Sequence, residues 1–228
     1  MAAAAGSGQR RAARLCPRGG TLRPEDDAMQ LPLYFDYACP WAYLGSCRAE
    51  AYFRDLGVEI DFRPVHLRRL VEPGVGKPPE LGPRKQRNAT SDVRHWAEMI
   101  GVEISPDARA LYRSDTQLAL RCALAAKDAG RFREFHHPAY RARWAEARDL
   151  SDEAVLRSLL REAGLDVEET LGRARSSALE ECLTRDTEAA IARGVFGVPT
   201  VFVGDEMFWG NDRFELVRFY LQKAQAGG

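Results

Sequence analysis

The chain has 228 residues, of which 45% are hydrophobic, so it is long enough to bury a sizeable core. Its 33 Lys and Arg balance its 33 Asp and Glu, and this argues against a nucleic-acid partner, which a clustered basic excess would indicate. The chain has no apolar run of about 18 residues, so no membrane-spanning helix is expected.

Residues 1–28 differ from the rest of the chain because they are rich in Ala, Gly and Arg and hold almost no large apolar residues. The segment lacks the continuous apolar stretch of a secretory signal, although its basic bias is that of an organelle transit segment. Gly and Pro interrupt any helix here. The favoured interpretation is therefore a disordered tail, or an upstream start codon with Met29 as the true start.

A strand, a helix and a second strand are predicted next. Residues 31–36 (LPLYFD) form a short apolar run with aromatics, which is typical of a buried strand. Pro40 at the first helical position and Gly57 after the last predict a helix over 40–56. Residues 58–63 alternate apolar and polar side chains, as a strand does. This spacing predicts a parallel βαβ unit with a right-handed connection.

Residues 64–89 are rich in Pro, Gly and basic side chains and are predicted to form a long loop, which in a compact domain is usually functional or disordered. Helical patterns fill roughly the next hundred residues. Ser151 is predicted to cap one of these helices, and Gly164 follows its end. Further helical segments are predicted around 118–129, over 132–145 and up to Gly194.

The β pattern returns near the end of the chain. Residues 200–203 predict a strand, and a turn at 204–205 leads to a returning strand over 207–209. Asp212 is predicted to cap a final helix over 213–225. The order β-α-β, helical block, β-β-α predicts an α/β fold in which one sheet holds all four strands and helices cover both faces.

Five cysteines are scattered without the regular spacing of a disulfide framework, and their odd number leaves at least one thiol free within a monomer. This favours a reducing compartment, so we expect a cytoplasmic protein. Cys122 and Cys182 lie on or beside apolar helical stripes and are predicted to be core residues. Cys16 belongs to the tail, and Cys47 lies just over two helical turns beyond Cys39.

Four stretches together resemble the DsbA-like thioredoxin family, and within it the 2-hydroxychromene-2-carboxylate isomerases and the kappa-class glutathione transferases. They are FDYACPWAYL (35–44), KPP with PRK (77–79 and 83–85), GVFGVPT (194–200) and FWGNDR (208–213). The resemblance covers about residues 31–222 and implies a thioredoxin-like fold with a large all-helical insertion. It divides the chain into a tail (1–28), a discontinuous thioredoxin-like domain (29–65 and 184–228) and a loop plus helical insertion (66–183).

Cys39 lies where the first predicted strand gives way to its helix. Unpaired N–H groups and a partial positive charge at a helix N-terminus stabilise a thiolate, so the pKa of this thiol is expected to fall below its free value of about 8.5. On position alone, a small buried side chain is an equally good interpretation. Ala42 stands where a dithiol oxidoreductase has its second cysteine, so a self-contained dithiol cycle is not expected.

The resemblance assigns roles around Cys39. The related isomerases and transferases usually have serine at this position, and its hydroxyl bonds the glutathione sulfur; Cys39 either takes that part or attacks disulfides. The bond between Val198 and Pro199 is implied to be cis and to face Cys39, so that Val198 pairs with the cysteinyl part of glutathione. Otherwise Pro199 is an ordinary loop proline.

Three further positions complete the expected glutathione site. Asn211 and Asp212 lie at a predicted helix N-terminus, which is expected to attract the α-carboxylate of glutathione, while Asp212 takes the γ-glutamyl ammonium and Asn211 donates or accepts; a plain N-cap is the alternative. Lys85 matches a family lysine that reaches the glycine carboxylate, with a solvated loop lysine as the alternative. Gly76 stands where the family tends to have asparagine, so one polar contact is missing or supplied elsewhere.

The remaining histidines and tryptophans are given lesser roles. His136 and His137 have no partner at metal-ligand spacing, so we expect no metal site and interpret them as a pair on a helix surface. Trp41 is expected to wall the substrate pocket, whereas Trp96 and Trp144 are interpreted as core residues.

The resemblance implies an enzyme that uses glutathione as cofactor to isomerise a small aromatic compound, converting a hydroxychromene carboxylate to its open benzylidenepyruvate form. One alternative is a glutathione-linked thiol–disulfide oxidoreductase or kappa-type transferase with Cys39 as the reactive thiol. Another is a binding module without catalysis. The expected partner is a small aromatic molecule, with no nucleic acid or membrane, and the relatives are commonly dimers, so a homodimer is compatible.

Overall fold

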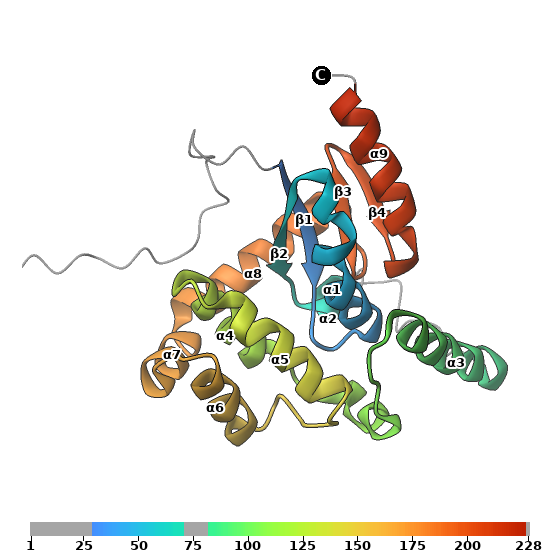
Figure 1. The fold of residues 1–228 in the computed structure, drawn as a ribbon. Coiled ribbons are helices and arrows are strands. Elements are labelled where there is room, and N and C mark those ends of the chain that lie inside the picture. Colours follow the sequence, from blue (N-terminus) through green and yellow to red (C-terminus); the bar gives the residue numbers. More distant parts are fainter. Residues whose placement is uncertain (1–28, 71–81, 227–228) are drawn as a thin grey trace, which may run out of the picture.

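The computed structural model describes residues 29–70 and 82–226. Its centre is a four-stranded sheet with the strand order β2-β1-β3-β4 (Figure 1). β1 runs parallel to β2 and β3 pairs antiparallel with β4, as predicted, and β1 also pairs antiparallel with β3. The strands are β1 (Met29–Phe35), β2 (Val58–Pro64), β3 (Thr200–Val203) and β4 (Glu206–Trp209).

The central strand β1 is buried because helices cover both faces of the sheet. Leu33 and Phe35, which point to one face, are fully buried, and Tyr34, which points to the other face, is only 5% exposed, so the strand reads as a continuous apolar run. Neighbouring residues of a strand point to opposite faces. Phe202 of β3 contacts Arg193, the residue after α8 (Ser177–Ala192). Phe208 of β4, which pairs with Val201 and so points to the opposite face, packs on Tyr220 in the middle of α9 (Phe214–Ala226), and the two helices therefore lie on opposite faces.

In the sequence the helical block falls between β2 and β3, and in space it lies on one side of the sheet (Figure 1). Its centre is α4 (Gln117–Asp128), in which Leu120, Cys122 and four alanines are fully or almost fully buried. Small side chains allow neighbouring helices to pack closely against α4. The other elements of the block are η2 (Pro106–Arg113), α5 (Phe132–Trp144), α6 (Glu153–Glu162) and α7 (Val167–Ala174).

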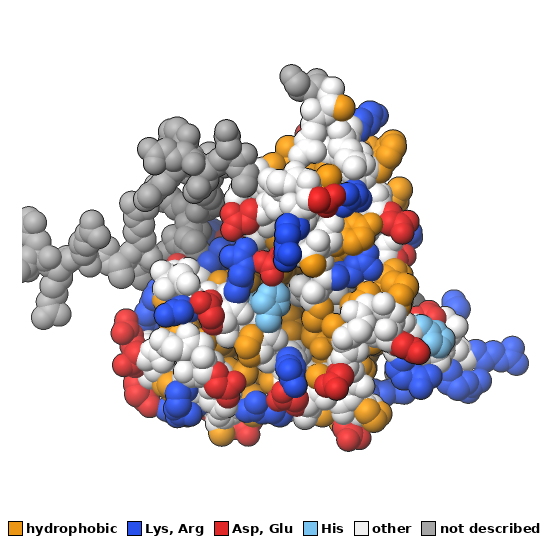
Figure 2. All heavy atoms as spheres, viewed as in Figure 1, with side chains coloured by type: hydrophobic (Ala, Val, Ile, Leu, Met, Phe, Trp, Pro, Cys, Tyr) orange, Lys and Arg blue, Asp and Glu red, His pale blue; other side chains and the backbone are white. Residues whose placement is uncertain are grey.

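The helix α3 (Pro83–Ile100) projects from the body of the molecule (Figure 1). Its second half contacts α1 (Pro40–Phe53), and Val93 and Ala97 are buried there. Its first half is exposed, and basic side chains gather at its outer end (Figure 2). A short 3-10 helix, η1 (Arg54–Leu56), follows α1.

The predicted loop over 64–89 is wrong at both ends. It contains the short helix α2 (Leu67–Leu70) and the first turns of α3, while residues 71–81 lie outside the described residues. Pro83 occupies the first turn of α3, where its missing N–H leaves no bond unmade. The basic side chains that follow are good helix formers.

Two predicted helix caps are also corrected. Asp152, not Ser151, caps α6: its backbone is extended and its carboxylate accepts a hydrogen bond from the N–H of Ala154. Asp212 does not cap the last helix, because it lies inside a 3-10 turn, η3 (Asn211–Arg213), after which α9 begins.

The predicted tail of residues 1–28 lies outside the described residues. The division into a discontinuous thioredoxin-like domain and an insertion stays a prediction, and its second boundary, at 183–184, falls within α8. Within residues 29–70 and 82–226, no helix is both long enough and apolar enough to cross a membrane.

Candidate active site

A buried carboxylate fixes the turn between β1 and α1. Asp36 is 1% exposed, and its two oxygens accept hydrogen bonds from Ala38 N at 2.9 Å, Leu67 N at 2.8 Å and Thr116 Oγ1 at 2.7 Å. Burial raises the pKa of Asp36, and these three bonds oppose the rise. The carboxylate therefore ties the turn that carries Cys39 to two other segments of the chain.

Cys39 is the N-cap residue of α1 and is 8% exposed. Its backbone is extended, and its N–H donates to Asp36 O at 3.1 Å while its carbonyl accepts from Tyr43 N at 3.1 Å. Pro40 follows at the start of the helix. The thiol Sγ donates to the carbonyl oxygen of Val198 at 3.1 Å, which joins the first part of the chain to the last.

The pKa of Cys39 moves in the direction opposite to the prediction. Burial raises it to about 12, and the N–H groups of Ala42 and Trp41 only partly oppose this, while the nearby charge of Asp36 adds to the rise. Desolvation of the sulfur thus outweighs the helix N-terminus. At neutral pH Cys39 is a protonated thiol, which acts as a hydrogen-bond donor.

The bond between Val198 and Pro199 is cis, as the resemblance implied. The ring of Pro199 packs against α1 at Gly45, where a built Cβ would lie 3.3 Å from Pro199 Cγ. Such a contact leaves little room for any side chain larger than hydrogen. The carbonyl of Pro199 accepts from Gly210 N at 2.9 Å, so this segment also holds the end of β4 in place beside Cys39.

The turn η3 presents one buried and one exposed polar side chain. Asn211 is 2% exposed, and its Oδ1 has no hydrogen-bond partner among the described residues. Asp212 is half-exposed and pairs with Arg213 at 3.4 Å. A buried acceptor without a donor is costly, so the Asn211 oxygen is suited to a donor supplied from outside the chain.

Lys85 and Trp41 occupy different surroundings. Trp41 is half-buried in the first turn of α1, next to Cys39. Lys85 is exposed in the first turn of α3, at the end of that helix that points away from the body (Figure 1), and no described contact brings it to Cys39. Ala42 is fully buried, and the free thiol Cys47 is exposed further along α1.

The prediction of a histidine pair on a helix surface is wrong for His136. This ring is fully buried, with Phe132 stacked on it at 4.7 Å and Tyr37 Oη 3.2 Å from its Nδ1. His136 follows Phe132 by four residues and so shares its apolar stripe, a signal that the sequence contained. His137 is half-buried and bonds Glu50 at 3.0 Å. The described residues contain no group of three or more ligands that could hold a metal ion.

Sequence reasoning also missed Asp36. An acidic residue directly after a buried strand was the available signal, because such a carboxylate commonly bonds the N–H groups of the turn that follows.

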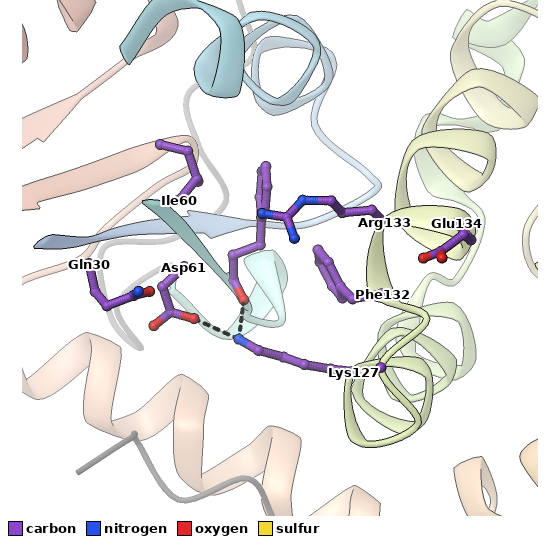
Figure 3. A pocket seen from close by; sticks show the side chains of 9 residues that line it. Gln30, Ile60, Asp61, Lys127, Phe132, Arg133 and Glu134 are labelled. Atoms are coloured by element: carbon purple, nitrogen blue, oxygen red, sulfur yellow. Dashed lines mark hydrogen bonds and ion pairs between the residues drawn. The ribbon is translucent and has the colours of Figure 1, made fainter. Parts of the chain in front are cut away.

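A hollow that the sequence did not indicate lies beside the outer strand β2 (Figure 3). It is bounded by the start of β1, the middle of β2, the end of α4 and the start of α5. Its residues are Gln30, Ile60, Asp61, Phe62, Lys127, Gly130, Phe132, Arg133 and Glu134. None of the predicted site residues lines it.

Comparison with known proteins places these features in a family. The sequence profile of the DSBA-like thioredoxin domain matches residues 30–222. The chain belongs to the DSBA-like thioredoxin family. It is 29% identical to the 2-hydroxychromene-2-carboxylate isomerase of Sphingobium xenophagum, over 84% of this chain and 97% of that protein. It is 21% identical to the kappa 1 glutathione S-transferase of Rattus norvegicus, over 86% of this chain and 92% of that protein.

Solved structures of this family share the fold. A 2-hydroxychromene-2-carboxylate isomerase superposes with a TM-score of 0.70 at 27% identity, over 86% of this chain and 96% of that one. A probable DsbA oxidoreductase from Streptomyces coelicolor superposes with a TM-score of 0.71 at 23% identity, over 87% and 90%. The thioredoxin-like fold with a helical insertion is therefore shown, and the named relatives support an enzyme of this DSBA-like family.

Proposed function

We propose that the protein is a glutathione-dependent isomerase of a small aromatic compound, similar in activity to 2-hydroxychromene-2-carboxylate isomerase. The observation that carries the proposal is the Cys39 thiol, which lies at the start of α1 and donates to the residue before a cis proline, with Ala42 in place of a second thiol. This arrangement suits a site that holds a sulfur compound without exchanging disulfides on its own.

The residues around Cys39 fit glutathione. The Asn211 oxygen, buried and unpaired, would accept from the ammonium of the γ-glutamyl group, and Asp212 would add a negative charge. Val198, directly before the cis proline, would pair through its backbone with the cysteinyl part. When bound, glutathione supplies a thiolate that adds to a conjugated double bond and leaves again after rotation about the resulting single bond.

The task of Cys39 follows from its protonation. A neutral thiol that donates to the Val198 carbonyl would donate instead to a ligand thiolate placed against it, which is the part that serine plays in the resembling enzymes. The N–H groups of Trp41 and Ala42 would also donate hydrogen bonds to the thiolate of the ligand. Donors fixed before the ligand arrives stabilise the ionised sulfur without reorganisation. Trp41, half-exposed at this turn, would form a wall for the aromatic substrate.

The second candidate is a glutathione-linked thiol–disulfide oxidoreductase or kappa-type transferase with Cys39 as the reacting thiol. The presence of a thiol at residue 39 favours this candidate, because a serine hydroxyl would be sufficient for an isomerase. Attack on a disulfide requires the thiolate, however, and a pKa raised to about 12 leaves very little of it at neutral pH. The electrostatics of this site thus favour the isomerase.

Substitution of Cys39 separates the two candidates. We expect Cys39→Ser to keep isomerase activity within about tenfold, because the hydroxyl is also a donor, and Cys39→Ala to lose about tenfold more. The assay is the ultraviolet absorbance change of 2-hydroxychromene-2-carboxylate, with and without added glutathione, and Cys47→Ser is the matched control. Activity that does not depend on glutathione would contradict the proposal. Glutathione–disulfide exchange that Cys39→Ser abolishes, without isomerase activity in the unmodified protein, would establish the second candidate.

A further inference from the structure

Arg48 lies on the face of α1 that is turned towards α3 and α9, and three aromatic rings surround its guanidinium. The carbon Cζ lies 4.7 Å from the ring centroid of Phe214, 4.9 Å from that of Tyr52 and 5.3 Å from that of Trp96. A planar guanidinium is attracted to aromatic faces, so rings from three helices hold this cation in one place.

The guanidinium has donors to spare. Its Nε is buried and has no hydrogen-bond partner. Among the described residues, no carboxylate lies within 4.0 Å of the guanidinium nitrogens, and no group accepts a hydrogen bond from them. Burial lowers the pKa of Arg48, while the charges of Asp212 and Glu215 oppose this. An arginine offers five donors that match a carboxylate, and here they are not used.

The same place holds a second unpaired group. The turn η3 contacts α1, and Phe214, which stacks on Arg48, directly follows it. Asn211 Oδ1 is buried there without a partner, and Asp212 is half-exposed beside it. A cation with free donors, an acceptor without a donor and a carboxylate therefore lie together. This set of charges matches an α-amino acid group, which carries one carboxylate and one ammonium.

We propose that Arg48 binds the α-carboxylate of the γ-glutamyl group, while Asn211 and Asp212 take its ammonium. This rests on the proposed use of glutathione, and it adds a binding residue on α1 that fixes which thiols the site accepts. Arg48 follows Cys39 by nine positions along the helix, a rise of about 14 Å. Helical side chains lean towards the N-terminus, and about eight bonds, spanning about 10 Å when extended, join the sulfur of glutathione to its γ-glutamyl carboxylate, so one ligand reaches from the Cys39 thiol to the guanidinium.

The test compares two thiols by isothermal calorimetry: glutathione and cysteinylglycine, which lacks the γ-glutamyl group. We expect Arg48→Met to raise the Kd of glutathione about tenfold or more and to leave that of cysteinylglycine within about twofold. Arg54→Met, which removes an exposed arginine just beyond α1, is the matched control and is expected to leave both affinities unchanged.

A readout without substitution guards against a variant that does not fold. In the unmodified protein, glutathione whose γ-glutamyl α-carboxylate is converted to an amide is expected to bind about tenfold more weakly than glutathione. Equal weakening of both thiols by Arg48→Met would mean that Arg48 only supports the fold, and full affinity for the amide would overturn the proposal. If the unmodified protein binds neither thiol, the proposed function fails together with this inference.

Discussion

The two ends of the central strand β1 differ in how their polar groups are paired. Beyond its last residue, around Cys39, the Asn211 oxygen is buried without a partner. Towards its first residue lies the hollow of Figure 3, where Lys127 Nζ donates to Asp61 Oδ1 at 2.6 Å and to Phe62 O at 3.0 Å. The hollow offers space, but its charges already satisfy one another.

Buried unpaired groups also occur elsewhere, as at His136 Nε2, so the difference teaches that such a group is informative where it lies beside a reactive side chain, as Asn211 does near Cys39. The pairs around the hollow have a structural purpose of their own. β2 is an edge strand, and the bond from Lys127 occupies a carbonyl that would otherwise be open to another strand. Arg133, also at the hollow, pairs with Glu50 and Glu59. Around Cys39 the Asn211 oxygen has no such partner among the described residues, as the proposed glutathione site requires.

The largest effect is expected when a buried carboxylate is removed from the Cys39 end. Asp36→Ala leaves Ala38 N, Leu67 N and Thr116 Oγ1 without an acceptor, and each lost bond costs about 1–3 kcal/mol, so a loss of about 3 kcal/mol or more in unfolding free energy is expected. Asp61→Ala at the hollow is the control and should cost about 1 kcal/mol, because Lys127 keeps its bond to the Phe62 carbonyl. Urea unfolding measures both. Equal losses would contradict the contrast between the two ends.

The buried ring of His136, which packs on Phe62 and Phe132 behind the hollow, should make the unfolding free energy depend on pH. Burial holds the pKa of His136 well below 6.5, so the folded protein keeps this ring neutral while the unfolded chain protonates it. Stability is then full above about pH 6.5 and falls by about 1.4 kcal/mol per pH unit below it, until the lowered pKa is reached. We expect His136→Phe to flatten this part of the stability profile.

His137→Gln is the matched control for that experiment, because it removes the neighbouring ring, which is half-buried and bonds Glu50. Groups such as Asp36 titrate in both proteins and cancel in the difference between their unfolding free energies. If His136→Phe keeps the dependence of unfolding free energy on pH that the unmodified protein has between pH 5 and 6.5, then His136 is protonated in the folded state. Water would then reach this ring despite its burial.

Features that depend on local chemistry could be predicted from the sequence. The strands and the first turn of α1 follow from Pro, Gly and apolar patterns within a few residues. The cis bond before Pro199 follows from the family resemblance alone. The pKa of Cys39 could not be predicted in the same way. The direction of this pKa shift depends on how many atoms from distant segments exclude water from the sulfur, and no local sequence pattern indicates that number.

The same limit applies to Arg48 and His136. In the sequence Arg48 is one basic residue of a helix, and only the approach of α3 and α9 surrounds it with rings and leaves its donors unused. For His136 the helical spacing from Phe132 was a readable signal, but the doublet with His137 suggested a surface pair. Lys85, which the motif match assigned to the site, lies exposed in the first turn of α3, and its role stays a prediction.

Thiol reactivity sharpens the contrast within α1. Burial raises the pKa of Cys39 to about 12 and that of Cys47 to about 11, and Cys47 is the more exposed of the two. At pH 8 the thiolate fraction of Cys39 is then about tenfold smaller, so iodoacetamide should label Cys47 at least about tenfold faster. Mass spectrometry of tryptic peptides follows both sites in one sample. Faster labelling of Cys39 would favour the oxidoreductase instead.

The smallest effect is expected at the hollow itself. Lys127→Met removes one of the two cations that line it, yet Asp61 keeps Arg63 at 2.7 Å, so the loss in unfolding free energy should stay below about 1 kcal/mol. Because this cation is already neutralised by its partner, it has no charge to offer a ligand, and the Kd of glutathione should change by less than about twofold. A clear loss of glutathione affinity in Lys127→Met, with none in Arg48→Met, would place the ligand in the hollow and reverse the argument from unpaired groups.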